Sequence, residues 1–403
     1  MRVSLNDIRL ARETLTQYLE PTPLLFNAWL SETLGCQLYL KLENMHPIGS
    51  FKIRGATYRI SRLSDAEKKR GVIAASAGNH AQGVAWGSRK LGINALIVMP
   101  KGAPLMKIQN TRMLGAEVVL EGDNYDEAYA AAMKLAKKSG RVFIHAFENA
   151  DVIAGQGTCG LEILDQLPDV EAIIGSIGGG GLMSGVSVAI KESRPKIKLY
   201  GCQATGAPAM SRSIRTGKAI KTDHVDTFAD GIAVARASDK ILPILHKNLD
   251  RCVEGGDQEI AAAVLTLLEK AKVVSEGAGA LPLVAAEKLR TKLKGRKVVL
   301  IISGGNIDVN LLSRIIDRGL IRAGRRVRVN VLISDRPGSL ARLTQLIAMQ
   351  GANILQAIHD RNEPAMGIDQ TDVALTLETR GPEHSAAVIE ALRKSVIRLD
   401  VLS

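Results

Sequence analysis

The sequence predicts an α/β protein with parallel sheets covered by helices on both faces, followed by a ferredoxin-like βαββαβ domain. Short runs of Val, Ile, Leu and Ala alternate with helical segments, as in the strand at 95–99 and the helix that begins near Leu105. Aromatic residues make up only 3% of the chain, which favours aliphatic packing between the layers. After residue 327 the expected elements follow the order strand, helix, strand, strand, helix, strand.

The first candidate site residue is Lys52, which follows a Pro-Gly turn and opens a predicted helix in the segment 49–56 (GSFKIRGA). Burial disfavours a charged ammonium, and the positive end of the helix macrodipole disfavours it again. Both effects lower the pKa of a lysine toward the range in which its free amine attacks a carbonyl. A lone lysine is more often a solvated surface charge, so this interpretation depends on the segments that accompany it.

Three further turns, each after a short apolar run, provide groups that suit a phosphorylated aldehyde cofactor. The segment 76–83 (SAGNHAQG) leads from a strand into a helix, where backbone N–H groups bind anions. The glycines at 178–181 let the backbone wrap a phosphate. Ser303 follows the buried strand 298–302, at the edge where open α/β sheets bind ligands. Each turn alone is compatible with an ordinary cap or loop, but together with Lys52 they indicate one site.

These motifs resemble the second fold type of pyridoxal-phosphate enzymes, and most closely the threonine dehydratases, also called threonine ammonia-lyases. The resemblance covers residues 1 to about 320 and implies pyridoxal 5'-phosphate as cofactor, with Lys52 as the catalytic Schiff-base lysine. It further assigns Phe51 to the cofactor ring, Asn79 to the ring hydroxyl, Gly178, Gly179, Gly180, Gly181 and Leu182 to the phosphate, Ser303 to the ring nitrogen, and Ser76, Ala77, Gly78, Asn79 and His80 to the substrate carboxylate.

The same resemblance implies deamination of L-threonine to 2-oxobutanoate and ammonia, with L-serine as a further substrate. Serine racemases of this fold carry a second serine where this chain has Ala77, so we expect elimination to dominate. They also hold a divalent metal with carboxylates where this chain has Gln203 and Ala209, so we expect no metal site. A serine racemase or serine dehydratase remains an alternative, as does an amino-acid sensor with vestigial catalytic lobes.

Two acidic residues have a less certain place in this scheme. Glu276 and Asp230 each lie in a segment that resembles a dehydratase motif near the cofactor. For Glu276, the preference of acidic residues for helix starts is the simpler explanation.

The resemblance also implies how the chain is divided. A large catalytic lobe would comprise residues 1–42 and 145–320, and a small lobe would comprise residues 43–144, with the cofactor between them. Residues 327–403 resemble an ACT domain, the amino-acid-sensing module. Its strands are predicted at 328–334, 354–360, 371–379 and 396–402, and its helices at 338–349 and 382–394.

The effector site is expected at the first turn of this ACT domain, at an interface with another copy of the chain. Asp335, Gly338, Ser339, Leu340 and Asn353 are the candidate effector-binding residues. Isoleucine or valine is the expected effector, and the homo-oligomer is expected to be a dimer or tetramer. A domain that only oligomerises, without a ligand, is the alternative.

Composition narrows the remaining function classes. The net charge of +12 arises from short basic clusters without interleaved aromatics, so we expect anionic small molecules rather than nucleic acid as partners. The four cysteines fit no zinc or disulfide spacing, which favours a reducing compartment. The chain shows no signal-peptide core and no membrane-spanning stretch. A cytoplasmic enzyme is therefore expected.

Overall fold

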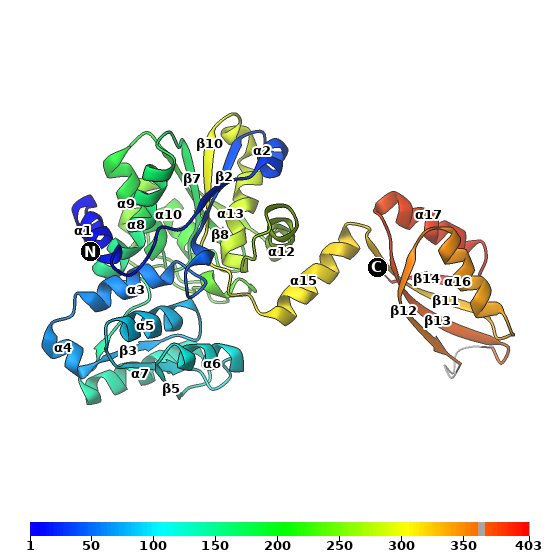
Figure 1. Ribbon diagram of the computed structural model, residues 1–403, viewed down its shortest axis with the longest axis horizontal. Coiled ribbons are helices and arrows are strands. Elements are labelled where there is room, and N and C mark those ends of the chain that lie inside the picture. Colours follow the sequence, from blue (N-terminus) through cyan, green and yellow to red (C-terminus); the bar gives the residue numbers. More distant parts are fainter. Residues whose placement is uncertain (362–366, 403) are drawn as a thin grey trace. The chain divides into compact units, whose positions relative to one another are not determined.

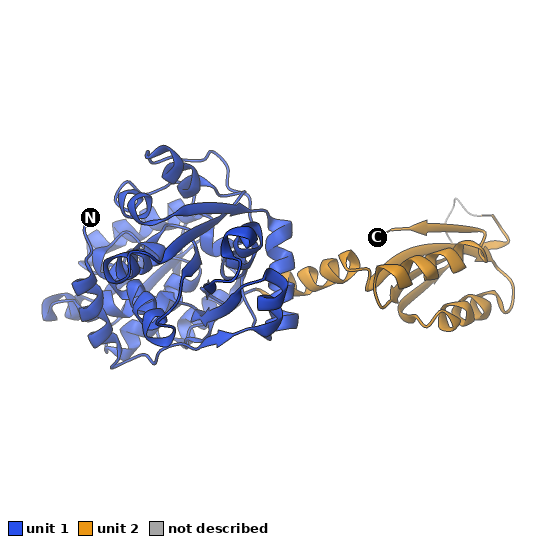
Figure 2. Cartoon of the chain, turned by 90° about the horizontal axis from the view of Figure 1, so that it is seen from above, with its two compact units in different colours: residues 1–307 blue, residues 308–403 orange. Residues whose placement is uncertain are grey.

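The computed structural model describes residues 1–361 and 367–402, and the chain divides into two compact units, 1–307 and 308–403 (Figure 2). Within the described residues, the first unit holds a six-stranded and a four-stranded sheet, and the second unit holds one four-stranded sheet. Both sheets of the first unit are built around parallel strands, whereas the sheet of the second unit is antiparallel. The fold class predicted from the sequence is thus confirmed.

The six-stranded sheet has the order β1-β2-β10-β7-β8-β9, and only the β1-β2 pair is antiparallel. Its strands are β1 (Leu24–Phe26), β2 (Gln37–Leu42), β7 (Ala172–Ser176), β8 (Lys198–Ala204), β9 (Arg251–Gly255) and β10 (Lys297–Ile302). The central strands β7 and β10 are almost wholly buried, as expected for a parallel sheet with both faces covered.

Helices cover both faces of this sheet because successive side chains of a strand point to opposite faces. At Gly175 a side chain would meet Met183 of α9 (Gly181–Ser193), whereas the neighbouring Ser176 donates to the carbonyl of Ala278 in α13 (Gly277–Lys288). Accordingly α9 lies on one face of the sheet and α13 on the other (Figure 1). The carboxyl ends of β7 and β10 carry the predicted glycine run and Ser303.

The smaller sheet of the first unit has the order β5-β4-β3-β6, and all of its pairs are parallel. Its strands are β3 (Val72–Ala75), β4 (Ala95–Met99), β5 (Glu117–Leu120) and β6 (Val142–Phe143). One face packs on α5 (Asn79–Lys90), and the other packs on the alanine-rich face of α7 (Tyr125–Ser139). The predicted turn at 76–80 therefore lies where β3 ends and α5 begins.

The remaining helices of the first unit complete these layers. They are α1 (Leu5–Leu15), α2 (Ala28–Leu34), α3 (Lys52–Ser61), α4 (Asp65–Arg70), α6 (Leu105–Met113), α8 (Ala150–Gln166), α10 (Ala209–Thr216), α11 (Leu242–Asn248), α12 (Asp257–Thr266) and α14 (Arg290–Leu293), with the single turns η1 (Glu43–Met45), η2 (Asp230–Ile232) and η3 (Leu267–Ala271). Among the described residues, no helix is long and apolar enough to cross a membrane.

The second unit begins with α15 (Val309–Arg322) and continues as the predicted βαββαβ order (Figure 1). Its elements are β11 (Arg326–Ser334), α16 (Ser339–Met349), β12 (Asn353–Asp360), β13 (Gln370–Glu378), α17 (Pro382–Arg393) and β14 (Arg398–Val401), and the sheet order is β12-β13-β11-β14. Several strands and helices of this unit begin or end one or two residues away from the predicted positions. The last strand begins two residues later than predicted, because Ser395 still bonds back to Leu392 of the preceding helix.

A buried cluster of four charged side chains joins α3 to β2, η1 and α8. Arg54 donates to both carboxylate oxygens of Glu43, at 2.6 and 2.8 Å, and to both of Glu162, at 2.5 and 2.8 Å. Lys41 donates to Glu162 at 2.5 Å and to the carbonyl of Thr22 at 2.7 Å. Burial alone would raise the pKa of Glu43, but Arg54 holds that pKa well below its ordinary value. Glu43 therefore stays ionised beside the Arg54 guanidinium.

Replacing Arg54 with Met should destabilise the first unit strongly, because two buried carboxylates lose their guanidinium partner. We expect a loss of about 3 to 5 kcal/mol in the free energy of unfolding, measured by urea denaturation. Arg12→Met is the matched control, because its pair with Asp165 is solvent-exposed and contributes about 1 kcal/mol or less. If both variants lost the same free energy of unfolding, the buried cluster would be no more important for stability than an exposed ion pair.

Candidate active site

Lys52 opens α3 directly beside the end of β10. The backbone N–H of Phe51 donates to the carbonyl of Ser303 at 3.0 Å, which ties the start of the helix to the strand end. The amine Nζ of Lys52 donates to the carbonyl of Ala146 at 3.0 Å and lies 5.4 Å from the centroid of the Phe51 ring. Burial lowers the pKa of Lys52 to about 8, and the negative charge of Glu276 opposes this shift. Roughly a tenth of the amine is therefore uncharged at pH 7.

Asn79, the first residue of α5, is held by two side chains from distant parts of the chain. Its amide Nδ2 donates to the two carboxylate oxygens of Glu276 at 2.9 and 3.0 Å. Its Oδ1 accepts from Nδ2 of Asn306 at 2.8 Å, and Asn306 also donates to the carbonyl of Ile48 at 2.7 Å. These bonds fix the amide orientation and join the turns before α3, α5 and α13.

Glu276 precedes α13 but does not cap that helix with its side chain. It is 5% exposed, and burial together with the negative charge of Asp230 raises its pKa to about 7. The Asn79 hydrogen bond, Lys107 and Lys52 counteract that shift. Glu276 can therefore hold or release a proton near neutral pH, which the interpretation as a simple helix-start acid did not foresee.

The glycine run forms a closely packed loop between β7 and α9. A side chain on Gly179 would lie 2.4 Å from the ring of Phe147, and one on Gly178 would lie 3.0 Å from the carbonyl of Gly231. Gly180 has a φ of +90°, a conformation that favours glycine. Because Gly180 has no side chain, nothing at that position caps the first turn of α9, whose N–H groups can face an anion.

The turn from Ser76 to His80 is half-buried except for His80, which is buried. The hydroxyl of Ser76 accepts from the N–H of Gly78 at 3.1 Å, so this side chain shapes the turn. The ring nitrogen Nε2 of His80 lies 2.8 Å from the carbonyl of Ile144 and must carry a hydrogen there, since a carbonyl only accepts. Burial and the nearby Lys52 lower the pKa of His80 to about 3. His80 therefore remains neutral and anchors the segment that follows β6.

That segment, residues 144–148, was not singled out from the sequence, yet it links Lys52 to the glycine loop. Nδ1 of His145 accepts from the N–H groups of Phe147 and Glu148 at 3.3 and 2.9 Å. The rings of His145 and Phe147 meet edge to face with centroids 4.8 Å apart. The only sequence signal is a concentration of aromatic and histidine residues in a chain with few of either.

The structure therefore brings together most of the residues expected to surround the cofactor. Lys52 connects through Ala146 and Phe147 to the glycine loop, and Phe51 connects to Ser303. Among the described residues, no group of three or more His, Cys, Asp or Glu side chains is arranged to hold a metal ion.

Four of the predicted effector residues lie in the second unit in the turn before α16 and at its start, whereas Asn353 lies at the opposite end of the sheet. Asp335 pairs with Arg361 at 3.1 Å, and the amide of Asn353 donates to Glu378 at 3.0 Å. Gly338 precedes α16 with a φ of +86°.

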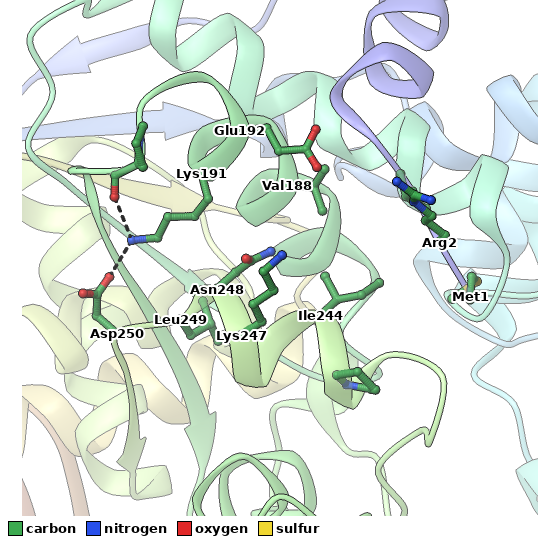
Figure 3. A pocket seen from close by; sticks show the side chains of 13 residues that line it. Met1, Arg2, Val188, Lys191, Glu192, Ile244, Lys247, Asn248, Leu249 and Asp250 are labelled. Carbon is green, nitrogen blue, oxygen red and sulfur yellow. Dashed lines mark hydrogen bonds and ion pairs between the residues drawn. The ribbon is translucent and has the colours of Figure 1, made fainter.

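A cavity of about 600 Å³ in the first unit contains none of the predicted site residues. It is lined by residues from the first three positions of the chain, from α9 and from α11 (Figure 3). Lys191 reaches Asp250 at 2.9 Å there, and Glu192 accepts from the N–H of Leu5 at 2.7 Å. Lys191, Glu192 and Asp250 thus already have partners within the protein.

Comparison with known proteins assigns each of the two units to a family. The family described as Pyridoxal-phosphate dependent enzyme matches residues 15–304, and the ACT domain matches residues 327–396. L-threonine ammonia-lyase of Thermotoga maritima is 49% identical over 382 residues, which cover 95% of each chain.

Two solved structures support the same assignment. The processed form of threonine deaminase isoform 2 from Solanum lycopersicum has a TM-score of 0.75 at 38% identity, covering 78% of this chain and 86% of that one. Maize serine racemase has a TM-score of 0.75 at 31% identity, covering 80% of this chain and 99% of its own. The first family match contains Lys52, Asn79, the glycine run and Ser303. The chain therefore belongs to the pyridoxal-phosphate dependent enzymes and carries an ACT domain after its catalytic unit.

Proposed function

We propose that this protein is a threonine ammonia-lyase, which converts L-threonine to 2-oxobutanoate and ammonia with pyridoxal 5'-phosphate and also accepts L-serine. The observation that carries the proposal is Lys52, a half-buried lysine with a lowered pKa inside the matched family region. The relative from Thermotoga maritima, which matches nearly the whole chain, is named for this activity.

The residues around Lys52 fit a pyridoxal phosphate molecule. The crowded, side-chain-free loop at 178–181 precedes the uncapped first turn of α9, which suits a phosphate. The Lys52 amine suits an aldehyde, because its pKa of about 8 leaves part of it nucleophilic. Asn79 is oriented by Glu276 and Asn306, and we assign it to the ring hydroxyl. We assign Ser303 to the ring nitrogen and Leu182 to the phosphate loop.

When bound, the cofactor supplies a conjugated system that withdraws electrons and acidifies the Cα–H bond of an amino acid. The protein's own contribution is to place proton carriers around that bond. Nζ of Lys52 can accept the Cα proton, and the carbonyl of Ala146 orients this amine. We assign the substrate carboxylate to the turn from Ser76 to His80, whose N–H groups open α5.

Serine racemisation is a second candidate function, favoured by the similarity to maize serine racemase. By the family resemblance, a racemase needs a proton donor on the second face of the substrate carbon. The methyl group of Ala77 stands at the position of that donor and cannot carry a proton. Elimination of water from threonine is therefore the function that we favour.

The ACT domain supports regulation by a small amino acid, and isoleucine or valine is the effector that we propose. A homo-oligomer of two or four copies and a cytoplasmic location belong to the same proposal. The four cysteines, all of them unpaired, are compatible with a reducing compartment.

Replacing Lys52 with Ala should remove the visible absorbance of the bound cofactor and lower 2-oxobutanoate production by about three orders of magnitude or more. Both losses follow from removal of the single amine that binds the aldehyde and moves the proton. The spectrum and a 2-oxo acid assay measure them, with Lys101→Ala, a solvent-exposed lysine of the same unit, as control. A wild-type protein that takes up no cofactor would support the sensor alternative instead.

Replacing Gly179 with Ala should weaken pyridoxal phosphate binding at least about tenfold, because the new methyl group would displace either Phe147 or the loop. Titration of the cofactor-free protein, followed by absorbance, gives the dissociation constant. Gly102→Ala is the matched control, since open space surrounds that position. Unchanged affinity in Gly179→Ala would contradict our assignment of the phosphate to this loop.

The raised pKa of Glu276 predicts how the stability of the protein depends on pH. Its pKa in the folded protein is about 7, above the ordinary value of 4.5. Between these two pH values the folded protein binds more protons than the unfolded chain, so the free energy of unfolding falls as the pH rises through this range. Cofactor-free Glu276→Gln should match the wild type near about pH 5 and exceed it by up to about 3 kcal/mol near about pH 8. Denaturation at both pH values measures this. The exposed substitution Glu13→Gln should show no such difference, and a pH-independent gap for Glu276→Gln would refute the prediction.

A further inference from the structure

A partly exposed ion pair joins the two sheet layers of the first unit. Nζ of Lys107 in α6 donates to Oδ2 of Asp230 in η2 at 2.6 Å. The helix α6 packs on α5 and β5 of the smaller sheet layer. The turn η2 packs on α13, which covers the six-stranded sheet. The ion pair therefore connects an element of one layer to an element of the other.

Few other buried contacts hold α6 in place. Of its nine residues only Ile108 and Thr111 are buried, and Leu105 is 74% exposed. The side chain of Lys107 is 26% exposed and that of Asp230 is 61% exposed, so their ion pair contributes little net stability. The contact between α6 and η2 can therefore break and form again readily.

The η2 turn lies directly against Glu276 and against the glycine loop. A side chain on Gly231 would lie 3.1 Å from Oε1 of Glu276. On its other side, the carbonyl of Gly231 would lie 3.0 Å from a side chain on Gly178. Asp230 is the neighbour of Gly231 in the chain, so the rim ion pair is adjacent to the turn that packs on the Glu276 carboxylate.

Charged and polar groups from four elements act on this carboxylate. Burial and the negative charge of Asp230 raise the pKa of Glu276 to about 7. A hydrogen bond from Asn79 of α5 and the positive charges of Lys107 and Lys52 oppose this rise. The two partners of the rim ion pair thus have opposite effects on Glu276. Without Lys107 nearby, Glu276 would bind a proton more readily.

The charge of Glu276 in turn affects two residues of the candidate active site. Both carboxylate oxygens accept from Nδ2 of Asn79, at 2.9 and 3.0 Å, whereas a protonated carboxyl group carries a hydrogen on one oxygen. The negative charge of Glu276 also opposes the effect of burial on the pKa of Lys52. Protonation of Glu276 would therefore loosen Asn79 and make the amine of Lys52 easier to deprotonate.

We propose that the ion pair between Lys107 and Asp230 is a latch that couples closure of α6 onto η2 to release of a proton from Glu276. In the closed state the ionised carboxylate holds Asn79 with two hydrogen bonds. In the open state the carboxylate takes up a proton from solvent water, and no other bond changes. Lys107 and Asp230 are positioning residues in this scheme, because they act on the site through Glu276. The proposal rests on the proposed function for its kinetic meaning.

Removing the two partners one at a time tests the coupling, since both substitutions break the same ion pair but have opposite effects on Glu276. Glu276 should bind its proton at higher pH in Lys107→Met and at lower pH in Asp230→Asn, each by at least about half a pH unit. Infrared absorption of the protonated carboxyl group in the cofactor-free protein, identified as the band lost in Glu276→Gln, follows this titration. Lys101→Met is the matched control, because its ion pair with Asp123 is exposed, and it should leave the titration unchanged.

The pH dependence of threonine deamination by the holoenzyme is the second measurement. The fall of kcat/KM on the acidic side of the optimum should move to higher pH in Lys107→Met and to lower pH in Asp230→Asn. Lys101→Met should keep the wild-type profile. Melting curves establish that each variant is folded.

Infrared titrations that are unchanged, or that move in the same direction in Lys107→Met and Asp230→Asn, would overturn the proposal. A lower kcat/KM in both variants with an unchanged pH profile would overturn it as well, because a latch without proton coupling gives that result. If the wild type shows no deamination, the proposed function fails, while the infrared titration still tests the coupling.

Discussion

The buried cluster of Lys41, Glu43, Arg54 and Glu162 is the interaction on which the geometry of the catalytic unit depends. Arg54 lies two residues after Lys52 in α3, so a shift of the helix at Arg54 also shifts the backbone that carries the reactive amine. Because the two carboxylates come from η1 and α8, the start of α3 is fixed from two sides. Such a cluster contributes little net stability compared with apolar packing, but it tolerates few alternative arrangements, since each displaced charge would remain buried without a partner.

Burial also sets the chemistry around Lys52, and it acts in opposite directions on acids and bases. It lowers the pKa of Lys52 to about 8 and raises the pKa of Glu276 to about 7, so both groups exchange protons close to neutrality. The same effect keeps His80 neutral and restricts it to an anchoring hydrogen bond. The site thus separates two proton carriers from a histidine that only holds the backbone in place.

The sequence predicted the parts of this arrangement that depend on local geometry. The sequence is enough to predict Lys52 after its Pro-Gly turn and the glycines before α9, because neighbouring residues determine where a helix begins and how a loop is shaped. The partners of Asn79 cannot be predicted from neighbouring residues, because Glu276 and Asn306 lie 197 and 227 residues away in the chain. Phe147 was not predicted either, because its contact with Gly179 also joins separate parts of the chain. The effector residues were inferred from motif position, whereas side-chain pairing within the folded domain decides whether Asp335 and Asn353 remain accessible.

The bonds of Asn306 have a mechanical consequence for the catalytic unit. Asn306 follows β10 of the six-stranded sheet. Its partners are Ile48, which precedes α3, and Asn79, which begins α5, and both helices pack with the smaller sheet. A rotation of one sheet layer against the other that preserves these bonds must pivot about this point. Lys107 of α6 also meets Asp230 of η2 at 2.6 Å, so the same rotation must either break this ion pair or carry both of its side chains along.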